Sequence, residues 1–171
     1  MLGGGFVNLL ACTPSIAAKF AAFAPVSAAF YTTTFNGNCP TERSTPILDF
    51  HGTADTVVPY NGGRSHGGTK VSIDNFRQGW ASRNGCQGNA MISRLSKDVD
   101  PRQLVEIQTW NMTCKAGGIV IGYKIGQGQH SWPRKTLPAK CGGKAGTDDC
   151  STTVFDATRS VIIPFFNNQS L

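Results

Sequence analysis

Short apolar runs alternate along this chain with segments of helical periodicity, and this order constrains the fold more than any other feature of the sequence. Residues 46–52 form the clearest run, with β-branched and aromatic side chains bounded by proline and glycine, as is typical of a buried strand. Residues 72–82 place Ile73, Phe76 and Trp80 on one helical face. This alternation predicts an α/β domain built on a largely parallel sheet.

The rest of the chain fits the same alternation. We expect further strands at residues 20–28, 103–110 and 118–125, and helices at residues 6–11 and 153–166. The chain has 171 residues, the size of one domain with an ordinary hydrophobic core, and neither a repeat nor a linker divides it. The sequence therefore predicts a single domain over residues 1–171.

Composition and charge argue against several classes of protein. Apolar residues of the AVILMFWYC set make up 40% of the chain and charged residues 15%, unlike the composition of disordered chains. No run of about 18 apolar residues, the length that a transmembrane helix needs, occurs. The net charge is +6, but the basic residues are scattered from Lys19 to Arg159 and form no cluster with aromatic residues. We therefore expect neither a membrane span nor nucleic-acid binding.

Six cysteines occur in the chain, and no two of them form a C-x-x-C pair. An even number without such pairs favours disulfides over zinc, so no metal site is predicted. The sequence alone does not fix the connectivity, but local spacing favours sequential pairing. The expected disulfides are Cys12–Cys39, Cys86–Cys114 and Cys141–Cys150.

The expected disulfides bear on the compartment, because disulfides persist in oxidising surroundings. Two sequons, at Asn111 and Asn168, are compatible with secretion. We therefore expect a secreted, extracellular protein. The chain nevertheless opens with MLGGG, which has neither the charged nor the apolar region of a signal peptide, so we expect that the true N-terminus is missing.

Two residues capable of acid–base chemistry each follow a predicted strand. Asp55 lies in the sequence HGTADTVVPY at residues 51–60, and His130 lies in GQGQHSWP at residues 126–133. Ligands and catalytic loops gather at the carboxyl ends of strands in open α/β sheets. An imidazole takes the proton of a serine hydroxyl, while a carboxylate fixes its tautomer and stabilises the imidazolium. The pair therefore predicts the acid and base of a Ser–Asp–His triad in that chain order.

Each of these residues also has a structural interpretation. Asp55 alone can be a turn former, since aspartate binds its own backbone in loops, and His130 alone can be a surface residue. Their pairing at two strand ends favours catalysis. The other histidines, His51 and His66, are interpreted as structural, because His51 falls at the end of a strand and His66 in a glycine-rich stretch.

The segments around Asp55 and His130 together resemble those of the secreted feruloyl esterases, in the carbohydrate-esterase branch that includes polyhydroxybutyrate-depolymerase-like proteins. The opening GGGFVNLLAC at residues 3–12 resembles the segment after the nucleophile in that family, and residues 20–28 resemble its next strand. The resemblance implies the C-terminal part of an α/β-hydrolase fold, with a mostly parallel sheet and flanking helices. It also implies ester hydrolysis without a cofactor, acting on feruloylated arabinoxylan or on a small feruloyl ester.

The family's nucleophile motif, G-x-S-x-G-G, meets a different residue here. Counting back from Gly3 and Gly4 puts the nucleophilic serine at position 1, which is Met1 in this chain, and the oxyanion-hole amide after it at Leu2. We therefore expect that the nucleophile and the upstream strands are missing, and that this chain alone is inactive.

Two further residues have a local context that suggests a role. Ser65 lies in GRSHG, a literal G-x-S-x-G, but no strand-to-helix turn is predicted there, and a serine after Asp55 breaks the triad order, so it is not taken as the nucleophile. Trp132, beside His130, can stack on an aromatic acyl group or simply pack the histidine loop.

Other functions stay open at this level. A non-catalytic remnant that binds a polysaccharide or a partner is consistent with the missing serine. A polyhydroxybutyrate depolymerase-like enzyme or an acetylxylan esterase keeps the enzyme class and changes the ester that is cut.

Overall fold

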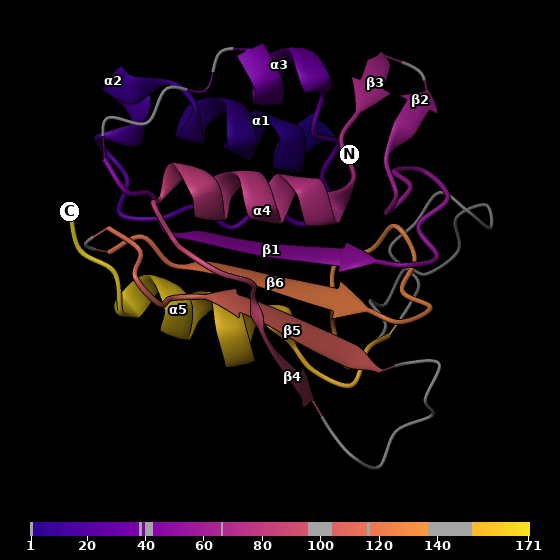
Figure 1. Ribbon diagram of the computed structural model, residues 1–171. Coiled ribbons are helices and arrows are strands. Elements are labelled where there is room, and N and C mark those ends of the chain that lie inside the picture. The colour runs from indigo at the N-terminus through magenta and orange to yellow at the C-terminus, as the bar shows by residue number, and fades with distance from the viewer. Residues whose placement is uncertain are drawn as a thin grey trace.

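The computed structural model describes residues 2–37, 39, 43–65, 67–95, 104–115, 117–136 and 152–171. Its centre is a four-stranded sheet of order β1–β6–β5–β4, shown in Figure 1. The strands are β1 (Ile47–Gly52), β4 (Met91–Leu95), β5 (Val105–Trp110) and β6 (Val120–Ile125). The strands expected at residues 46–52, 103–110 and 118–125 are thus confirmed as β1, β5 and β6.

The sheet is mixed, and the prediction of a mostly parallel sheet is wrong. β1 and β6 run parallel, whereas β5 runs antiparallel to both β6 and β4. Only residues 111–119 connect β5 to β6, and so short a connection joins antiparallel neighbours, since a parallel pair needs a crossover of about a dozen residues or more. The expected partial α/β-hydrolase fold, with its mostly parallel sheet, is corrected accordingly to a small fold on a mixed sheet.

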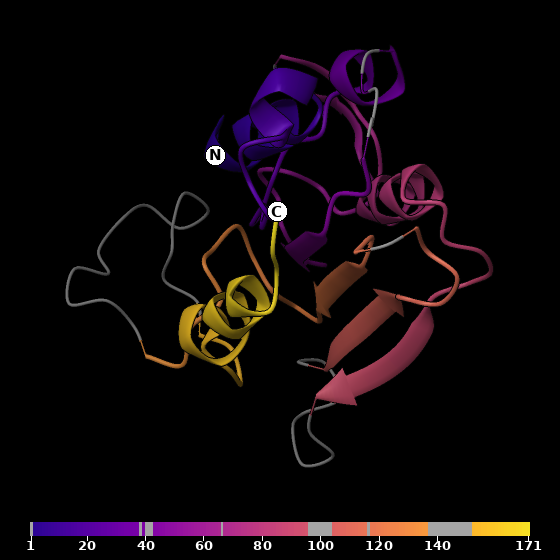
Figure 2. The same cartoon turned by 90° about the vertical axis from the view of Figure 1, so that its left-hand side faces the viewer.

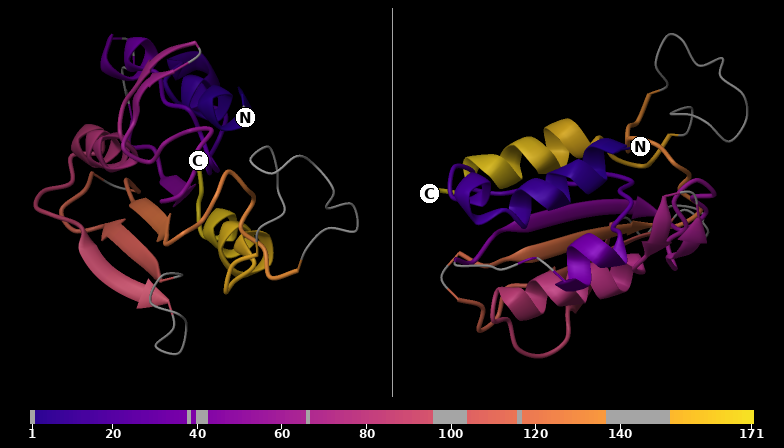
Figure 3. Two further views of the ribbon diagram at one scale, coloured as in Figure 1. Left: turned by 90° about the vertical axis from the view of Figure 1, so that its right-hand side faces the viewer. Right: turned by 90° about the horizontal axis from the view of Figure 1, so that it is seen from above.

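Helices lie on both faces of this sheet. α4 covers one face and α5 the other, as Figures 2 and 3 show. The helices are α1 (Leu2–Ala11), α2 (Pro14–Ala17), α3 (Thr32–Gly37), α4 (Ile73–Arg83) and α5 (Ile163–Asn167). Two short strands, β2 (Gly63–Ser65) and β3 (Gly68–Lys70), form a separate antiparallel pair.

The helix expected at residues 72–82 is confirmed as α4. Ser72 is its N-cap, and the Ser72 hydroxyl accepts a hydrogen bond from the Asn75 backbone N–H at 3.2 Å. Arg83 lies in the last turn, where a positive charge interacts favourably with the helix dipole. Phe76 and Trp80 are fully buried against the sheet, as their spacing predicts.

The helix expected at residues 153–166 begins later in the structure. A π-helical turn, Thr158–Ile162, leads into α5. Pro164 lies in the first turn of α5, and because proline has no N–H, it removes one bond of the regular α-helical ladder beside this turn.

The segment at residues 20–28 is not a regular strand, although it lies along the free edge of β1. Two isolated parallel bridges join Phe23 to Ile47 and Val26 to Phe50. Pro25 interrupts the ladder because it has no N–H to donate, while its carbonyl accepts from the Phe50 backbone N–H. The segment therefore extends the sheet past β1 without forming a continuous strand.

Two disulfides confirm two of the three expected pairs. Cys12–Cys39 joins the residue after α1 to the segment after α3, and Cys86–Cys114 joins the segment after α4 to the β5–β6 connection. Closing loops of this length restricts the unfolded chain and so stabilises the fold. Cys141 and Cys150 lie outside the described residues.

None of the helices in the described ranges has the length and apolar character that crossing a bilayer requires.

Candidate functional site

Asp55 lies in the turn that follows β1, and it is 4% exposed. Its Oδ1 accepts hydrogen bonds from the backbone N–H groups of Val57 at 2.9 Å and Val58 at 2.7 Å. The carboxylate thus organises its own turn, as the structural interpretation anticipates. This leaves Oδ2 for partners elsewhere in the chain.

His130 is that partner. Its Nδ1 lies 2.8 Å from Asp55 Oδ2, and the ring is almost fully buried. A carboxylate only accepts hydrogen bonds, so Nδ1–H donates and Nε2 is the basic nitrogen of the neutral ring. The predicted contact between the two side chains is confirmed. The expected orientation of Nε2 toward Met1 and Leu2 stays a prediction, because Met1 lies outside the described residues.

The parallel pairing of β1 with β6 explains how residues 75 positions apart meet. Gly52 and Ile125, the last residues of the two strands, lie opposite each other, so both following loops leave the same end of the sheet. The Ala54 backbone N–H then donates to the Gly128 carbonyl at 2.9 Å. The loops approach so closely at Gly52 that a Cβ there would overlap the Gly128 carbonyl, which is why glycine is needed at this position.

The Asp55 carboxyl is held in its charged form. Burial raises its pKa, but hydrogen bonds from His130, His51 and the Val58 backbone outweigh that effect and hold the pKa well below the usual 3.8. A negative charge beside the His130 Nδ1–H is the arrangement that fixes the tautomer and stabilises an imidazolium.

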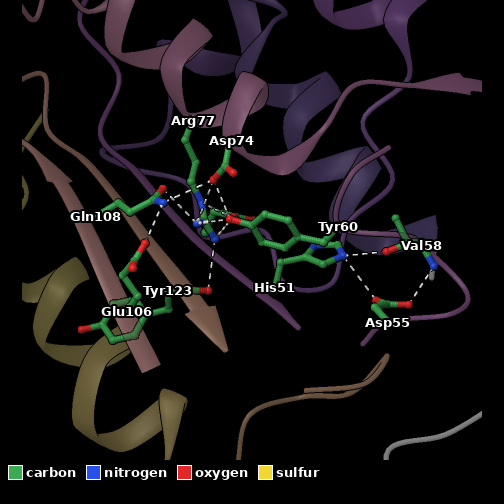
Figure 4. Close-up of polar contacts among 10 residues, drawn as sticks. His51, Asp55, Val58, Tyr60, Asp74, Arg77, Glu106, Gln108 and Tyr123 are labelled. Carbon is green, nitrogen blue, oxygen red and sulfur yellow. Dashed lines mark hydrogen bonds and ion pairs between the residues drawn. The ribbon is translucent and has the colours of Figure 1, made fainter. Parts of the chain in front are cut away.

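His51 also contacts the acid, a contact that sequence reasoning missed. This residue of β1 is fully buried, its Nε2 lies 2.8 Å from the Val58 carbonyl oxygen, and the same Nε2 lies 3.3 Å from Asp55 Oδ2 (Figure 4). The available signal was an imidazole four residues before the acid, inside a strand whose residues are buried throughout.

A buried polar network lies farther along the same face of the sheet, beneath α4. Fully buried Arg77 donates to Asp49 Oδ2 at 2.9 Å from Nε, and to the Tyr60 hydroxyl at 3.0 Å and Gln108 Oε1 at 3.1 Å from Nη1. Gly122 makes room for this guanidinium, because a Cβ on Gly122 would overlap it. Periodicity placed position 77 on the helix but gave no sign of this network.

Tyr60 links the network to the site. Its hydroxyl donates to Asp74 Oδ1 at 2.6 Å, and its ring meets the His51 ring edge-on with centroids 6.0 Å apart (Figure 4). Burial is the main reason that the Tyr60 pKa is raised, with Asp74 adding to it against the opposing charge of Arg77. The hydroxyl therefore stays protonated and keeps its place as a donor.

Ser27 supports the histidine loop from the other side. This buried residue has a φ of 46°, unusual for a residue with a side chain, and its Oγ donates to the Ser131 carbonyl at 3.0 Å. The next residue along from His130 is thereby tied to the segment that lines β1. Sequence reasoning did not single out Ser27.

The remaining sequence candidates take different positions. Trp132 is 37% exposed, and its Nε1 donates to Thr158 Oγ1 at 3.0 Å, a packing contact, while stacking on an acyl group stays a prediction. Ser65 ends β2 in a hairpin with β3, not in a strand-to-helix turn. Leu2 begins α1, and His66 lies outside the described residues. Within the described ranges, no group of three or more His, Cys, Asp or Glu residues could hold a metal ion.

Comparison with known proteins gives one informative similarity. Feruloyl esterase B of Piromyces equi is 34% identical to this chain over 130 residues. The match covers 71% of this chain and 22% of the relative, so the chain spans about a fifth of the length of that protein. No family model matches the chain, and no solved structure matches it. The similarity supports a relationship to feruloyl esterases at the level of the esterase class.

Proposed function

We propose that Asp55 and His130 are the acid and base of a serine carboxylic-ester hydrolase of the feruloyl esterase type. The observation that carries the proposal is the 2.8 Å contact between His130 Nδ1 and Asp55 Oδ2 at one end of the sheet. The similarity to feruloyl esterase B agrees with it. The comparisons give no support to polyester depolymerisation, and binding without catalysis rests only on the missing serine at position 1.

The proposed chemistry follows from the proton positions. With Nδ1–H donating to Asp55, His130 Nε2 takes the proton of a serine hydroxyl as that oxygen attacks the ester carbonyl. The charged carboxylate stabilises the imidazolium that forms, and the imidazolium returns the proton to the leaving alcohol. The second half repeats the exchange with water. Backbone amides stabilise the oxyanion, and the Leu2 amide is the candidate for one of them.

The nucleophile is the part of the proposal that this chain does not supply at the expected position. Met1 stands where the serine belongs, and a thioether has no proton for His130 to remove. Loss of a triad nucleophile lowers kcat by about 10⁶-fold in a well-studied serine protease. We therefore propose that residues 1–171 hold the acid and base and turn over esters no faster than background.

The proposed substrate is a feruloyl ester of arabinoxylan or a small feruloyl ester. Trp132, two residues after His130 and partly exposed, offers an aromatic surface on which a feruloyl ring can stack. Two disulfides are consistent with an extracellular setting.

The test is hydrolysis of methyl ferulate by four proteins. These are the chain itself, its His130→Ala variant, a chain with Met1→Ser behind an added Met-Gly-Xaa start, and that serine-bearing chain with Asp55→Asn. We expect equal background rates in the first two, a higher rate in the third, and loss of that gain in the fourth.

Two results would contradict parts of the proposal. Turnover by the serine-bearing chain that stays unchanged in Asp55→Asn, and also when His130→Ala is made in that same chain, would remove these residues from the mechanism. Turnover by the unaltered chain that vanishes in His130→Ala would keep the base and move the nucleophile to another hydroxyl, for which Ser65→Ala is the next variant to assay.

A further inference from the structure

We propose that His51 is a positioning residue that orients the Asp55 carboxylate through its Nε2–H, an inference that rests on the proposed function of Asp55 as the acid. His51 has no exposed surface and lies within β1. It cannot reach a substrate, so its role is to act through Asp55.

Both oxygens of the Asp55 carboxylate have partners. Oδ1 accepts two backbone N–H groups, from Val57 and Val58. Oδ2 faces His130 Nδ1 at 2.8 Å and His51 Nε2 at 3.3 Å. Rotation of the carboxylate about its Cβ–Cγ bond would break contacts at both oxygens, and His51 adds a second contact at Oδ2 beside that of His130.

The contacts of the His51 ring show which of its nitrogens bears the proton. The Val58 carbonyl oxygen only accepts, so His51 Nε2, at 2.8 Å, must bear the proton. His51 Nδ1 is buried and has no hydrogen-bond partner among the described residues, so a second proton there would lack an acceptor. Nε2–H is therefore the donor, shared between a carbonyl oxygen and a carboxylate.

These contacts close a ring that includes the turn itself. The Val58 N–H donates to Asp55 Oδ1, the Val58 carbonyl accepts from His51, and the same His51 nitrogen faces Asp55 Oδ2. Tyr60 packs edge-on against the imidazole and fixes its plane. The strand thus holds the turn and the acid with a single N–H group, which an apolar residue at position 51 could not do.

The test reads the His130 Nδ1–H proton by NMR in the unaltered chain of residues 1–171, with ¹⁵N-labelled histidine. The chain has three histidines, so His66→Gln and His130→Ala complete the assignment. The measured quantity is the exchange rate of that proton with water. Two variants place an amide at different distances from the backbone: His51→Gln reaches the Nε2 position, whereas His51→Asn reaches only the Nδ1 position.

We expect exchange at about the original rate in His51→Gln and about tenfold faster exchange in His51→Asn, the effect of losing one hydrogen bond to a charged group. Ile47→Val, on the same face of β1, is the control for a loss of stability without loss of a donor, and its exchange rate should stay near the original. Equal rates in the Gln and Asn variants would overturn the proposal, and so would an equal acceleration in Ile47→Val.

Turnover then separates this inference from the proposed function. In the serine-bearing chain, we expect His51→Asn to lower kcat for methyl ferulate with KM unchanged. We expect His51→Gln to keep kcat near that of the serine-bearing chain with His51. The proton measurement needs no turnover, so it tests His51 even if the esterase assay fails. A normal exchange rate in His51→Asn together with loss of turnover in Asp55→Asn would reject the role of His51 and leave the proposed function intact.

Discussion

The two faces of the central sheet differ in the polar groups that they bury, although the same strands form both. Leu48 and Phe50 of β1 point to the α5 side, where the buried side chains are apolar and aromatic. Asp49 and His51 alternate with them on the α4 side, where an ion pair and a chain of polar groups are buried beside a second apolar cluster. A strand alternates its side chains with period 2, so β1 can stabilise the fold on one face and serve the candidate site on the other.

The fold depends on matched partners where the sheet buries polar groups. An apolar face tolerates loss of volume in proportion to the volume lost. A buried polar face is more sensitive to the loss of one partner, because the partner that remains is a buried charge without compensation.

Breaking the ion pair on the polar face should have the largest effect. Arg77→Leu leaves the buried Asp49 carboxylate without its partner, and we expect the free energy of unfolding to fall by about 3–5 kcal/mol. Urea denaturation at pH 7 measures it. The double variant Asp49→Leu/Arg77→Leu should recover much of the loss, and a double variant that is less stable than Arg77→Leu alone would contradict the comparison.

Removing volume from the apolar face should cost somewhat less. Leu48→Ala deletes a fully buried side chain that packs in the cluster with Phe50 and Tyr123. We expect a loss of about 3 kcal/mol, measured in the same urea titration. The tryptophan fluorescence and the NMR signal of the His130 Nδ1 proton should stay unchanged in the folded state, since the α5 face does not support the site. A lost proton signal would mean that the two faces are coupled.

Replacing the acid should change the pH dependence of stability. The Asp55 pKa is lower in the folded chain than the ordinary 3.8, so its stabilisation is complete above 3.8 and is lost as the pH falls through the lower folded value. Asp55→Asn should cost about 1.5–3 kcal/mol at pH 7, because hydrogen bonds to a charged group are lost. Its deficit relative to the unaltered chain should shrink below pH 3.8 in urea titrations at stepwise lower pH. A deficit independent of pH would show that the carboxylate charge contributes nothing.

The smallest expected effect is at Ser27. Ser27→Ala removes the hydrogen bond to the Ser131 carbonyl and leaves a side chain at a φ of 46°, which should cost about 1 kcal/mol. Ser27→Gly removes the same bond at a backbone angle that glycine adopts freely. Thermal unfolding should rank the two variants with glycine the more stable, and the reverse order would mean that the backbone angle is not a source of strain.

The positions of the strands could be predicted from the sequence, whereas their directions could not. Runs of β-branched and aromatic residues at 46–52 and 118–125 predicted β1 and β6, and helical spacing predicted α4. Periodicity says nothing about direction, however, and the short β5–β6 connection, which makes that pair antiparallel, outweighed the expectation of parallel strands. Pro25 likewise turned an apolar run into two isolated bridges.

The same distinction holds for the site. Asp55 and His130 could be paired because each follows a strand and one carries the acid, the other the base. His51 and Ser27 could not be assigned, since their contacts depend on three-dimensional packing: the Ser27–Ser131 bond spans 104 positions of the chain. A histidine in a buried strand gives no sequence signal for which nitrogen bears the proton or which acceptor it finds.

Gly122 has a consequence for how the helix and the sheet assemble. On the face of β6 beneath α4, Val120 and Lys124 flank Gly122, and only the glycine leaves a notch that admits the Arg77 guanidinium. A helix shifted along the strand would press its charge against a valine or a lysine and away from Asp49. The space at Gly122 and the charge of Arg77 therefore restrict α4 to one register against the sheet. This register keeps Tyr60 in contact with the imidazole of His51.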